Sequence, residues 1–206
     1  MTLRLIALLF CAAAVAAAQE PKQEKKEEKK KPERAKIDEA VTDFKLKDVM
    51  QDEEKFVTLS EFKDKKVVVL YFVSDKCSVT WKYEGRTGKL FEDFRKKDVV
   101  FLGIRSASND TNEQIRKYCE SKNFEIPVLA DEKNVIADYY NVRFTPVYVV
   151  IDKKGILRYK GGMDDLQTAK TWNNDEAGVK TNYVRDALTA VLDGKDVTTK
   201  EFAGYG

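Results

Sequence analysis

Residues 67–81 read VVVLYFVSDKCSVTW, and this stretch decides the fold that the sequence predicts. Its first seven residues, 67–73, are continuously apolar and rich in β-branched side chains, which is typical of a strand covered on both faces of a parallel sheet. Two similar runs follow at 99–104 (VVFLGI) and 147–151 (VYVVI), and polar stretches with helical spacing separate all three. The alternation predicts βαβ units and therefore an α/β fold, with a central sheet flanked by helices.

Other local signals complete the predicted topology. A Thr-x-x-Gln capping box at Thr111 and Gln114 marks the start of a helix. Helices are expected over 78–97, from 111 to about 124, over 132–140, and from 184 to a stop at Gly194. A short lead-in hairpin is expected at 44–48 and 56–59, and an antiparallel edge strand at 156–159 after a turn at 152–155. The antiparallel strand makes the predicted sheet a mixed one.

The composition of the 206-residue chain suits one globular domain, with 43% hydrophobic and 35% charged residues. The chain contains no histidine, which excludes Ser-His-Asp and Cys-His catalytic sites and histidine-ligated zinc or haem. Any catalysis must therefore come from thiols, carboxylates, lysines or phenols. The net charge of +2 is too small to support nucleic-acid binding. We expect no metal, no cofactor and no nucleic-acid partner.

Residues 1–18 have the pattern of a secretory signal peptide. One early cation, Arg4, precedes an apolar run that ends in Ala16-Ala17-Ala18, an Ala-x-Ala cleavage site. The run is shorter than the roughly 20 apolar residues that span a bilayer, so we expect no integral membrane segment after cleavage. Cys11 raises a lipoprotein alternative, but the bulky Phe10 stands where a lipobox has a small residue. We expect an exported protein, periplasmic or extracellular.

Residues 19–36 read QEPKQEKKEEKKKPERAK, with eight basic, five acidic and almost no apolar side chains. Such a segment cannot bury enough surface to fold, so it is predicted to be a disordered charged linker. The interleaved glutamates favour a solvated spacer over a tail that binds polyanions. The folded domain is therefore expected over residues 37–206.

Cys77 follows the strand at 67–73 and precedes the helix at 78–97, the place where open α/β sheets bind their ligands. Backbone N–H groups and the positive end of the helix dipole would stabilise a thiolate there by about 0.3–1 kcal/mol, and the neighbouring Lys76 would add to this. Cys77 is therefore the candidate nucleophile. The competing interpretation is a buried, inert cysteine at the end of the strand.

Thr145-Pro146 immediately precedes the strand at 147–151, where a proline does not fit as an ordinary central-strand residue. We predict a cis peptide bond there. A buried strand, a cysteine after it and a Thr-Pro turn before a later hairpin together resemble the thioredoxin superfamily. The resemblance implies a thioredoxin-like fold in which the cis-proline loop faces the cysteine and binds an extended partner peptide.

The chain also resembles one branch of that superfamily. The runs DFKLKD at 43–48 and LSEFKDK at 59–65 are similar to the opening of redoxin-domain members, the alkyl hydroperoxide reductase/thiol-specific antioxidant (AhpC/TSA) group. The run GGMDD at 161–165 and the closing helix are similar to exported bacterial redoxin-domain proteins. The likeness covers almost all of residues 41–193.

The resemblance implies thiol–disulfide exchange through a mixed disulfide at Cys77. A protein thiol or disulfide would be the partner, and an external thiol the electron donor. The family's C-x-x-C motif is here Cys77-Ser78-Val79-Thr80, so Thr80 replaces the second thiol and its hydroxyl is expected to hold the thiolate. The buried acid of thioredoxins would fall at Tyr71. Trp81 is expected to border a partner groove together with Thr145 and Pro146.

A thiol peroxidase is one alternative. Peroxiredoxins carry P-x-x-x-[T/S]-x-x-C and a later arginine; Ser74 fits the hydroxyl position, but Leu70 replaces the proline and Pro146 the arginine. Cys119 resembles the resolving cysteine of atypical two-cysteine peroxidases, so a small peroxide would oxidise Cys77 and a disulfide to Cys119 would follow. The competing interpretation of Cys119 is a cysteine that fills the core.

A non-catalytic binding module that keeps the fold and the partner groove is a further alternative, which the missing second cysteine supports. Two other features are expected to be ordinary surface. Arg105 is expected to form a surface ion pair, and the acidic runs at 164–165 and 173–176 to be solvated turns rather than a calcium loop.

Overall fold

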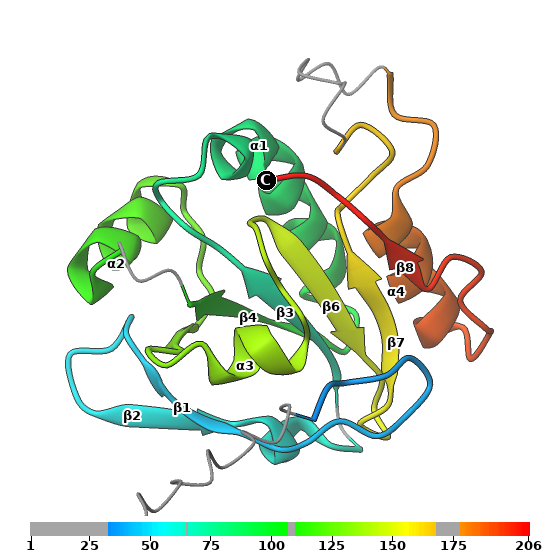
Figure 1. Ribbon diagram of the computed structural model, residues 1–206, viewed down its shortest axis with the longest axis horizontal. Coiled ribbons are helices and arrows are strands. Elements are labelled where there is room, and N and C mark those ends of the chain that lie inside the picture. Colours follow the sequence, from blue (N-terminus) through cyan, green and yellow to red (C-terminus); the bar gives the residue numbers. More distant parts are fainter. Residues whose placement is uncertain (1–32, 65, 107–109, 168–177) are drawn as a thin grey trace, which may run out of the picture. The chain divides into compact units, whose positions relative to one another are not determined.

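The structure is a computed structural model that describes residues 33–64, 66–106, 110–167 and 178–206 (Figure 1). The predicted signal peptide at 1–18 and most of the predicted linker at 19–36 lie outside the described residues. Both therefore stay predictions, as does the lipoprotein alternative at Cys11.

The described residues form one eight-stranded mixed sheet in the order β2-β1-β5-β4-β3-β6-β7-β8. The strands are β1 (Lys45–Asp48), β2 (Lys55–Thr58), β3 (Val67–Phe72), β4 (Val99–Arg105), β5 (Val128–Ala130), β6 (Val147–Ile151), β7 (Leu157–Gly161) and β8 (Glu201–Phe202). At the centre, β3 pairs parallel with β4 and antiparallel with β6. Every residue of β3 is buried, as its continuous apolar run predicts. The predicted mixed sheet and lead-in hairpin are confirmed.

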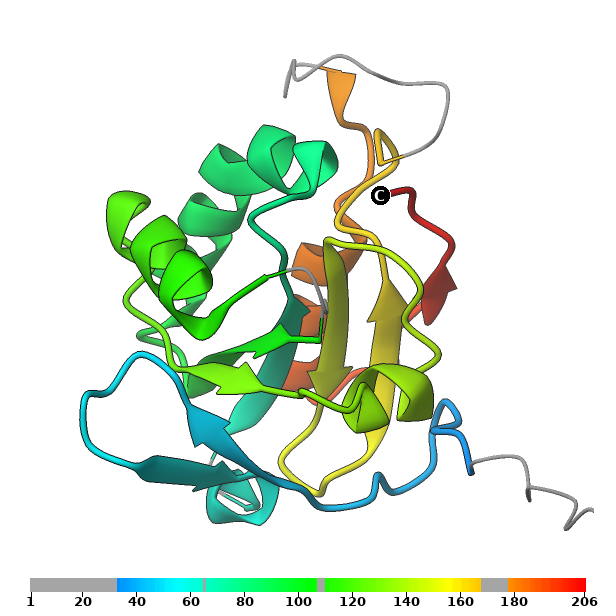
Figure 2. The ribbon, with the colours of Figure 1, turned by 60° about the vertical axis from the view of Figure 1, so that its left-hand side comes forward.

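Helices cover both faces of the sheet (Figure 2). They are the 3₁₀ helix η1 (Leu59–Phe62) and the α-helices α1 (Ser78–Phe94), α2 (Asn112–Ser121), α3 (Val135–Tyr139) and α4 (Tyr183–Leu192). The buried side chains of α1, α2 and α4 share one apolar cluster with Val69 and Tyr71 of β3. Those of α3 and η1 share another with Val68 and Leu70. Alternate residues of one strand thus enter opposite cores, which explains the absence of polar residues from its sequence.

The capping box predicted at the start of α2 is confirmed. The backbone N–H of Gln114 donates to the Thr111 hydroxyl at 3.1 Å, and the Gln114 side chain accepts from the Thr111 N–H at 2.9 Å. The helix predicted at 132–140 is shorter, because the Asp131 carboxylate accepts the N–H groups of Ile136 and Ala137 and α3 begins only after Asn134.

One prediction about the sheet is corrected, and one strand was not predicted. The strand predicted at the edge over 156–159 is β7, and it is an inner strand because β8 pairs with it, placing Lys160 opposite Glu201. β5 was not predicted at all, since its three residues are too few to show a period. Only its pairing with β1 and β4 identifies it as a strand.

Candidate functional site

The candidate site lies where the parallel strand β3 ends and α1 begins. Cys77 is the N-cap residue of α1, with an extended backbone (φ −89°, ψ 116°) that turns the chain from the Ser74–Lys76 loop into the helix. Its carbonyl accepts the first helical hydrogen bond, from the N–H of Trp81 at 3.2 Å. The side chain is partly exposed and carries a free thiol. The position predicted for Cys77 is therefore the one it takes.

The direction of the sulfur differs from the prediction. The Cys77 side chain makes no capping hydrogen bond to the N–H groups of α1. Instead, its thiol donates to the carbonyl oxygen of Thr145, with Sγ 3.0 Å from that oxygen. The Thr145-Pro146 peptide bond is cis, and we call these two residues the proline loop. The thiol form of the site is thus tied to the proline loop rather than to the helix terminus, because a neutral thiol donates to an acceptor, and a carbonyl oxygen is an acceptor whereas a helix N–H is a donor.

Thr80 and Trp81 take different places around the thiol. Thr80 is fully buried, and its hydroxyl donates to the Thr145 hydroxyl at 3.4 Å, so it links α1 to the proline loop. Trp81 is 53% exposed, and its indole N–H donates to the Asp75 carbonyl at 2.8 Å. A large aromatic ring held at the surface beside a thiol is a feature of a protein-binding face.

Ser74 and Asp75 form the loop that leads to the thiol, and both contact Asp110, the residue before the N-cap of α2. The Ser74 hydroxyl is almost buried and accepts the N–H of Lys76 at 3.2 Å. Burial of Asp110, and then its contact with the Asp75 carboxyl, raise the pKa of Asp110 to about 6. The sequence does not reveal this carboxyl pair, since 35 positions separate its members.

Arg105 lies beneath this pair and corrects an expectation. It is buried rather than at the surface, and it donates to the Asp110 carbonyl at 3.1 Å while pairing with Glu132 at 3.8 Å. Its position at the end of the inner strand β4 is the physical reason, because both faces of that strand are covered. The guanidinium therefore positions the start of α2.

Cys119 is completely buried on α2, in the same apolar cluster against which Cys77 packs. Burial, and then the charges of Glu120 and Asp75, raise the pKa of the Cys119 thiol to about 12. Both cysteines are free thiols. A resolving role for Cys119 stays a prediction, and it requires part of α2 to unwind, because a sulfur enclosed by the core cannot meet a partner.

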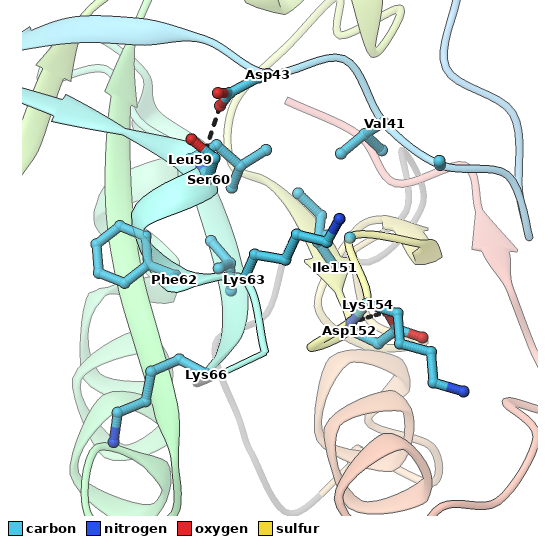
Figure 3. A pocket seen from close by; sticks show the side chains of 13 residues that line it. Val41, Asp43, Leu59, Ser60, Phe62, Lys63, Lys66, Ile151, Asp152 and Lys154 are labelled. Atoms are coloured by element: carbon cyan, nitrogen blue, oxygen red, sulfur yellow. Dashed lines mark hydrogen bonds between the residues drawn. The ribbon is translucent and has the colours of Figure 1, made fainter.

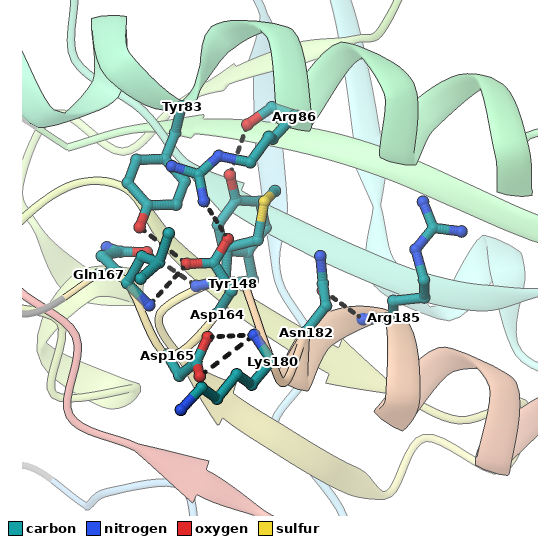
Figure 4. A network of polar contacts seen from close by, with 12 residues as sticks. Tyr83, Arg86, Tyr148, Asp164, Asp165, Gln167, Lys180, Asn182 and Arg185 are labelled. Carbon is teal, nitrogen blue, oxygen red and sulfur yellow. Dashed lines mark hydrogen bonds and ion pairs between the residues drawn. The ribbon is translucent and has the colours of Figure 1, made fainter. Parts of the chain in front are cut away.

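A buried polar network around Asp164 joins α1 to the chain that follows β7 (Figure 4). Asp164 is fully buried and accepts from Tyr83 of α1 at 2.9 Å and from Arg86 of α1 at 2.5 Å. The expectation that Asp164 lies in a solvated turn is wrong, because these two side chains replace its water. The companion run at 173–176 lies outside the described residues.

Gln167 extends that network to the site, and no signal in the sequence identified it. Its backbone N–H donates to the Asp164 carbonyl at 3.1 Å. Its side chain is almost fully buried and donates to the Pro146 carbonyl at 2.7 Å. The proline loop is thus fixed on one side by Thr80 and on the other by Gln167.

Two cavities border this sheet at different ends. One of about 310 Å³ lies beside the site and includes Ser74, Phe144 and Thr145 in its wall. Another of about 190 Å³, lined by residues such as Leu59, Lys63 and Ile151, lies at the opposite end of β3 (Figure 3). Only the first can contribute to chemistry at Cys77.

The described residues contain neither a membrane-spanning helix nor a metal-binding cluster. No described helix combines the length and the apolar character that a membrane crossing needs. Within the same ranges, no group of three or more cysteine, aspartate or glutamate side chains is arranged to hold a metal ion.

The sheet order, the cysteine at the start of α1 and the cis-proline loop opposite it define a thioredoxin-like fold of the redoxin type. The AhpC/TSA family model matches residues 37–160, and the chain belongs to this family. Among curated proteins, the chain is 27% identical over 116 residues to "Thioredoxin-like protein YneN" of Bacillus subtilis (strain 168). That match covers 56% of this chain and 65% of YneN, slightly less than two thirds of the relative.

Solved structures support the same fold. A hypothetical protein from Sinorhizobium meliloti 1021 superimposes with a TM-score of 0.69 at 24% identity, covering 82% of this chain and 92% of that one. The reduced 2-Cys peroxiredoxin of Plasmodium vivax superimposes with a TM-score of 0.51 at 25% identity, covering 60% and 70% of the two chains. Both similarities agree with the fold that the sheet order and the family match show.

Proposed function

We propose that this protein is an exported thiol–disulfide oxidoreductase that acts through Cys77, in the periplasm or outside the cell. The observation that carries the proposal is the partly exposed Cys77 thiol at the start of α1, with its sulfur 3.0 Å from the Thr145 carbonyl. Membership of the AhpC/TSA family supports the thiol chemistry. The signal-peptide pattern of residues 1–18 supports export.

The proposed reaction begins when the Cys77 thiol loses its proton to solvent. The thiolate attacks one sulfur of a partner disulfide, so that a Cys77–partner bond forms, the partner's S–S bond breaks, and the second partner sulfur leaves as a thiolate. An external thiolate then attacks the partner sulfur of this mixed disulfide. That step re-forms the Cys77 thiolate and leaves a disulfide between the external thiol and the partner.

Deprotonation of Cys77 also changes the hydrogen bonding of the proline loop. Deprotonation of Cys77 breaks its hydrogen bond to Thr145 and leaves that carbonyl oxygen without this donor. The N–H of an extended partner backbone is a suitable replacement donor. Thr145 and Pro146 are therefore proposed to orient the partner, with the exposed Trp81 ring beside them as an apolar contact.

The proposed roles of the two hydroxyl groups follow from their positions. Thr80 acts by holding the Thr145 side chain, and Ser74 by holding the loop that precedes the thiol. Neither supplies a second sulfur, so release of the partner depends on an external thiol. The exchange is therefore slow without one.

The test is reaction of the reduced protein with a chromogenic aromatic disulfide. The full chain, with Cys11→Ser so that the thiol in the predicted signal peptide does not react, is expected to release one equivalent of the coloured thiol and to retain the other half of the reagent on Cys77, as located by peptide mass spectrometry. Cys77→Ser is expected to release none, whereas Cys119→Ser serves as the matched control and keeps the reaction. Failure of Cys77 to react would leave the non-catalytic binding module as the better interpretation.

A thiol peroxidase is the second candidate, supported by the family and by the peroxiredoxin neighbour. In that reaction, Cys77 would be oxidised to a sulfenic acid by peroxide, with release of water or an alcohol, and Cys119 would condense with it. Mass spectrometry after mild hydrogen peroxide distinguishes the two candidates. A 77–119 crosslink supports the peroxidase, and its absence supports exchange with an external thiol.

A further inference from the structure

The segment after β8 returns to the candidate site. β8 adds a parallel strand to β7, and the Gly162 N–H donates to the Phe202 carbonyl at 3.1 Å. Beyond it, the Tyr205 N–H donates to the Gln167 carbonyl at 3.0 Å. Figure 1 shows this segment running from β8 past the ends of β7 and β6 toward α1. Residues 203–206 are therefore placed on the site by backbone contacts, and we call them the 203–206 segment.

The 203–206 segment and the Cys77 thiol both lie close to the Thr145 carbonyl oxygen. A Cβ added at Gly206 would overlap the Thr145 carbonyl oxygen and would lie 2.9 Å from the Phe144 ring. The same carbonyl oxygen accepts the Cys77 thiol at 3.0 Å. A polypeptide that approaches the sulfur over the proline loop therefore meets this segment first.

Gln167 joins the proline loop to the 203–206 segment. Its side-chain amide donates both to the Pro146 carbonyl at 2.7 Å and to the Tyr205 carbonyl at 3.2 Å. The amide oxygen accepts the Met163 N–H at 2.7 Å, so the donor end cannot turn away without losing that bond. Loop and segment are thus held by one buried side chain.

Glycines allow this close approach. A Cβ added at Gly204 would lie 2.9 Å from the Gly162 Cα, closer than real Cβ atoms come to backbone, and 3.1 Å from the Gln167 side-chain amide nitrogen. The segment therefore packs this closely against Gly162, Gln167 and Thr145 only because Gly204 and Gly206 carry no side chain. Bulkier residues would lift it from the site.

We propose that the proline loop is an interaction surface occupied by the chain's own 203–206 segment, which a polypeptide partner must displace to reach Cys77. The inference rests on the proposed function and adds a regulation to it. Cys77 remains partly exposed with the segment in place, so small molecules reach the sulfur without displacing it. The site therefore discriminates by size: a small disulfide reacts at once, and a polypeptide disulfide reacts only when the segment is displaced.

The experiment compares two reagents on three variants of the full chain, each with Cys11→Ser so that the thiol in the predicted signal peptide does not react. The reagents are the small aromatic disulfide and a short extended peptide whose only cysteine carries the same chromogenic leaving group. The variants are a deletion of residues 203–206, the substitution Gly204→Ala, and Gly85→Ala as a matched control, since a Cβ at the exposed Gly85 meets nothing within 4 Å. Urea unfolding of each variant checks that it is folded.

The deletion is expected to raise the rate with the peptide by about tenfold, the effect of removing a contact held by one or two hydrogen bonds. Gly204→Ala is expected to raise it in the same direction by less, and Gly85→Ala to leave it unchanged. The rate with the small disulfide is expected to stay within about twofold in every variant.

Three outcomes would overturn the inference or its basis, and they can be told apart. Equal peptide rates in the full chain and the deletion would overturn the role of the segment while leaving Cys77 reactive. A rise of the same size with both reagents would overturn discrimination by size. A Cys77 that reacts with neither reagent in any variant would overturn the proposed function itself.

Discussion

The two cysteines in the described part of the chain border the same apolar cluster, yet they differ in what they can do. Cys77 lies between the end of β3 and the start of α1, partly exposed, with a carbonyl oxygen as its hydrogen-bond partner. Cys119 lies inside the cluster, fully buried, with a strongly raised pKa. The comparison teaches that the reactivity of a thiol is set by the element that carries it: a helix N-cap projects its side chain out of the core, and the apolar face of a helix does not.

The largest difference is expected in alkylation at pH 8. With a pKa of about 12, only about one Cys119 thiol in 10⁴ is ionised, against about a quarter of an ordinary free cysteine. Native Cys119 should therefore react on the order of 10³-fold more slowly than a free thiol. When the protein is unfolded in urea, Cys119 should react as fast as a free thiol. Peptide mass spectrometry after timed alkylation measures this. Rapid labelling of native Cys119 would break the comparison.

A second thiol placed near Cys77 sharpens the comparison. Thr80→Cys restores the C-x-x-C spacing with a residue of similar size, so an intramolecular attack replaces the external thiol. The mixed disulfide at Cys77 should then resolve faster by on the order of 10² or more, because a held thiol has a high effective concentration. Release of the coloured partner thiol gives the rate. Thr80→Ser, which keeps the hydroxyl, is the control, and an unchanged lifetime in Thr80→Cys would contradict the prediction.

The structural role of Cys119 predicts a smaller effect. Cys119→Ala removes one buried heavy atom from the cluster and should lower the free energy of unfolding by about 1–2 kcal/mol, with no change in the reaction of Cys77 with the small disulfide. Urea unfolding and the chromogenic assay measure the two quantities. Loss of turnover with stability preserved would instead point to a resolving cysteine.

The carboxyl pair near both thiols predicts the smallest effect, a dependence of stability on pH. The pKa of Asp110 is about 6 in the folded protein and about 3.9 when unfolded, so the folded state binds more protons between these values. Its contribution to stability is present below about pH 4 and is lost as the pH rises through about 6.

Asp110→Asn removes this titration, so the variant should gain on the order of 1 kcal/mol relative to the native chain between pH 4 and 6.5. Urea unfolding at both pH values measures it. Asp193→Asn, at the exposed end of α4, is the matched control. The prediction would be contradicted if the free energy of unfolding changed with pH to the same extent in the native chain and in Asp110→Asn.

Much of the fold could be predicted from local pattern. The continuous apolar runs of β3, β4 and β6 identify inner strands because a strand covered on both faces has no polar positions. The Thr111 capping box identifies the start of α2, because the two side-chain bonds that define it lie within one helical turn. Short elements such as β5 could not be predicted, since three residues are too few to show a periodic pattern of apolar side chains.

Some features of the candidate site could likewise be predicted from the sequence, and others could not. The position of Cys77 after a buried strand and the cis bond of Thr145-Pro146 could be predicted from the sequence, because each depends on neighbours in the chain. The direction of the sulfur was not, because the Thr145 carbonyl that receives it lies 68 positions away. Arg105 and Asp164 were misjudged for a related reason: burial of a charge depends on partners that only the folded chain supplies.

The sequence by itself determined the class of fold, the order of its central elements and the cysteine at the mouth of the sheet, because periodicity and local hydrogen bonds act over a few residues. The tertiary structure alone decided which atom faces the sulfur, which carboxyls are buried, and that residues 203–206 lie against the proline loop. Those contacts join residues 21 to 81 positions apart, and such pairings arise from packing, which no single segment encodes.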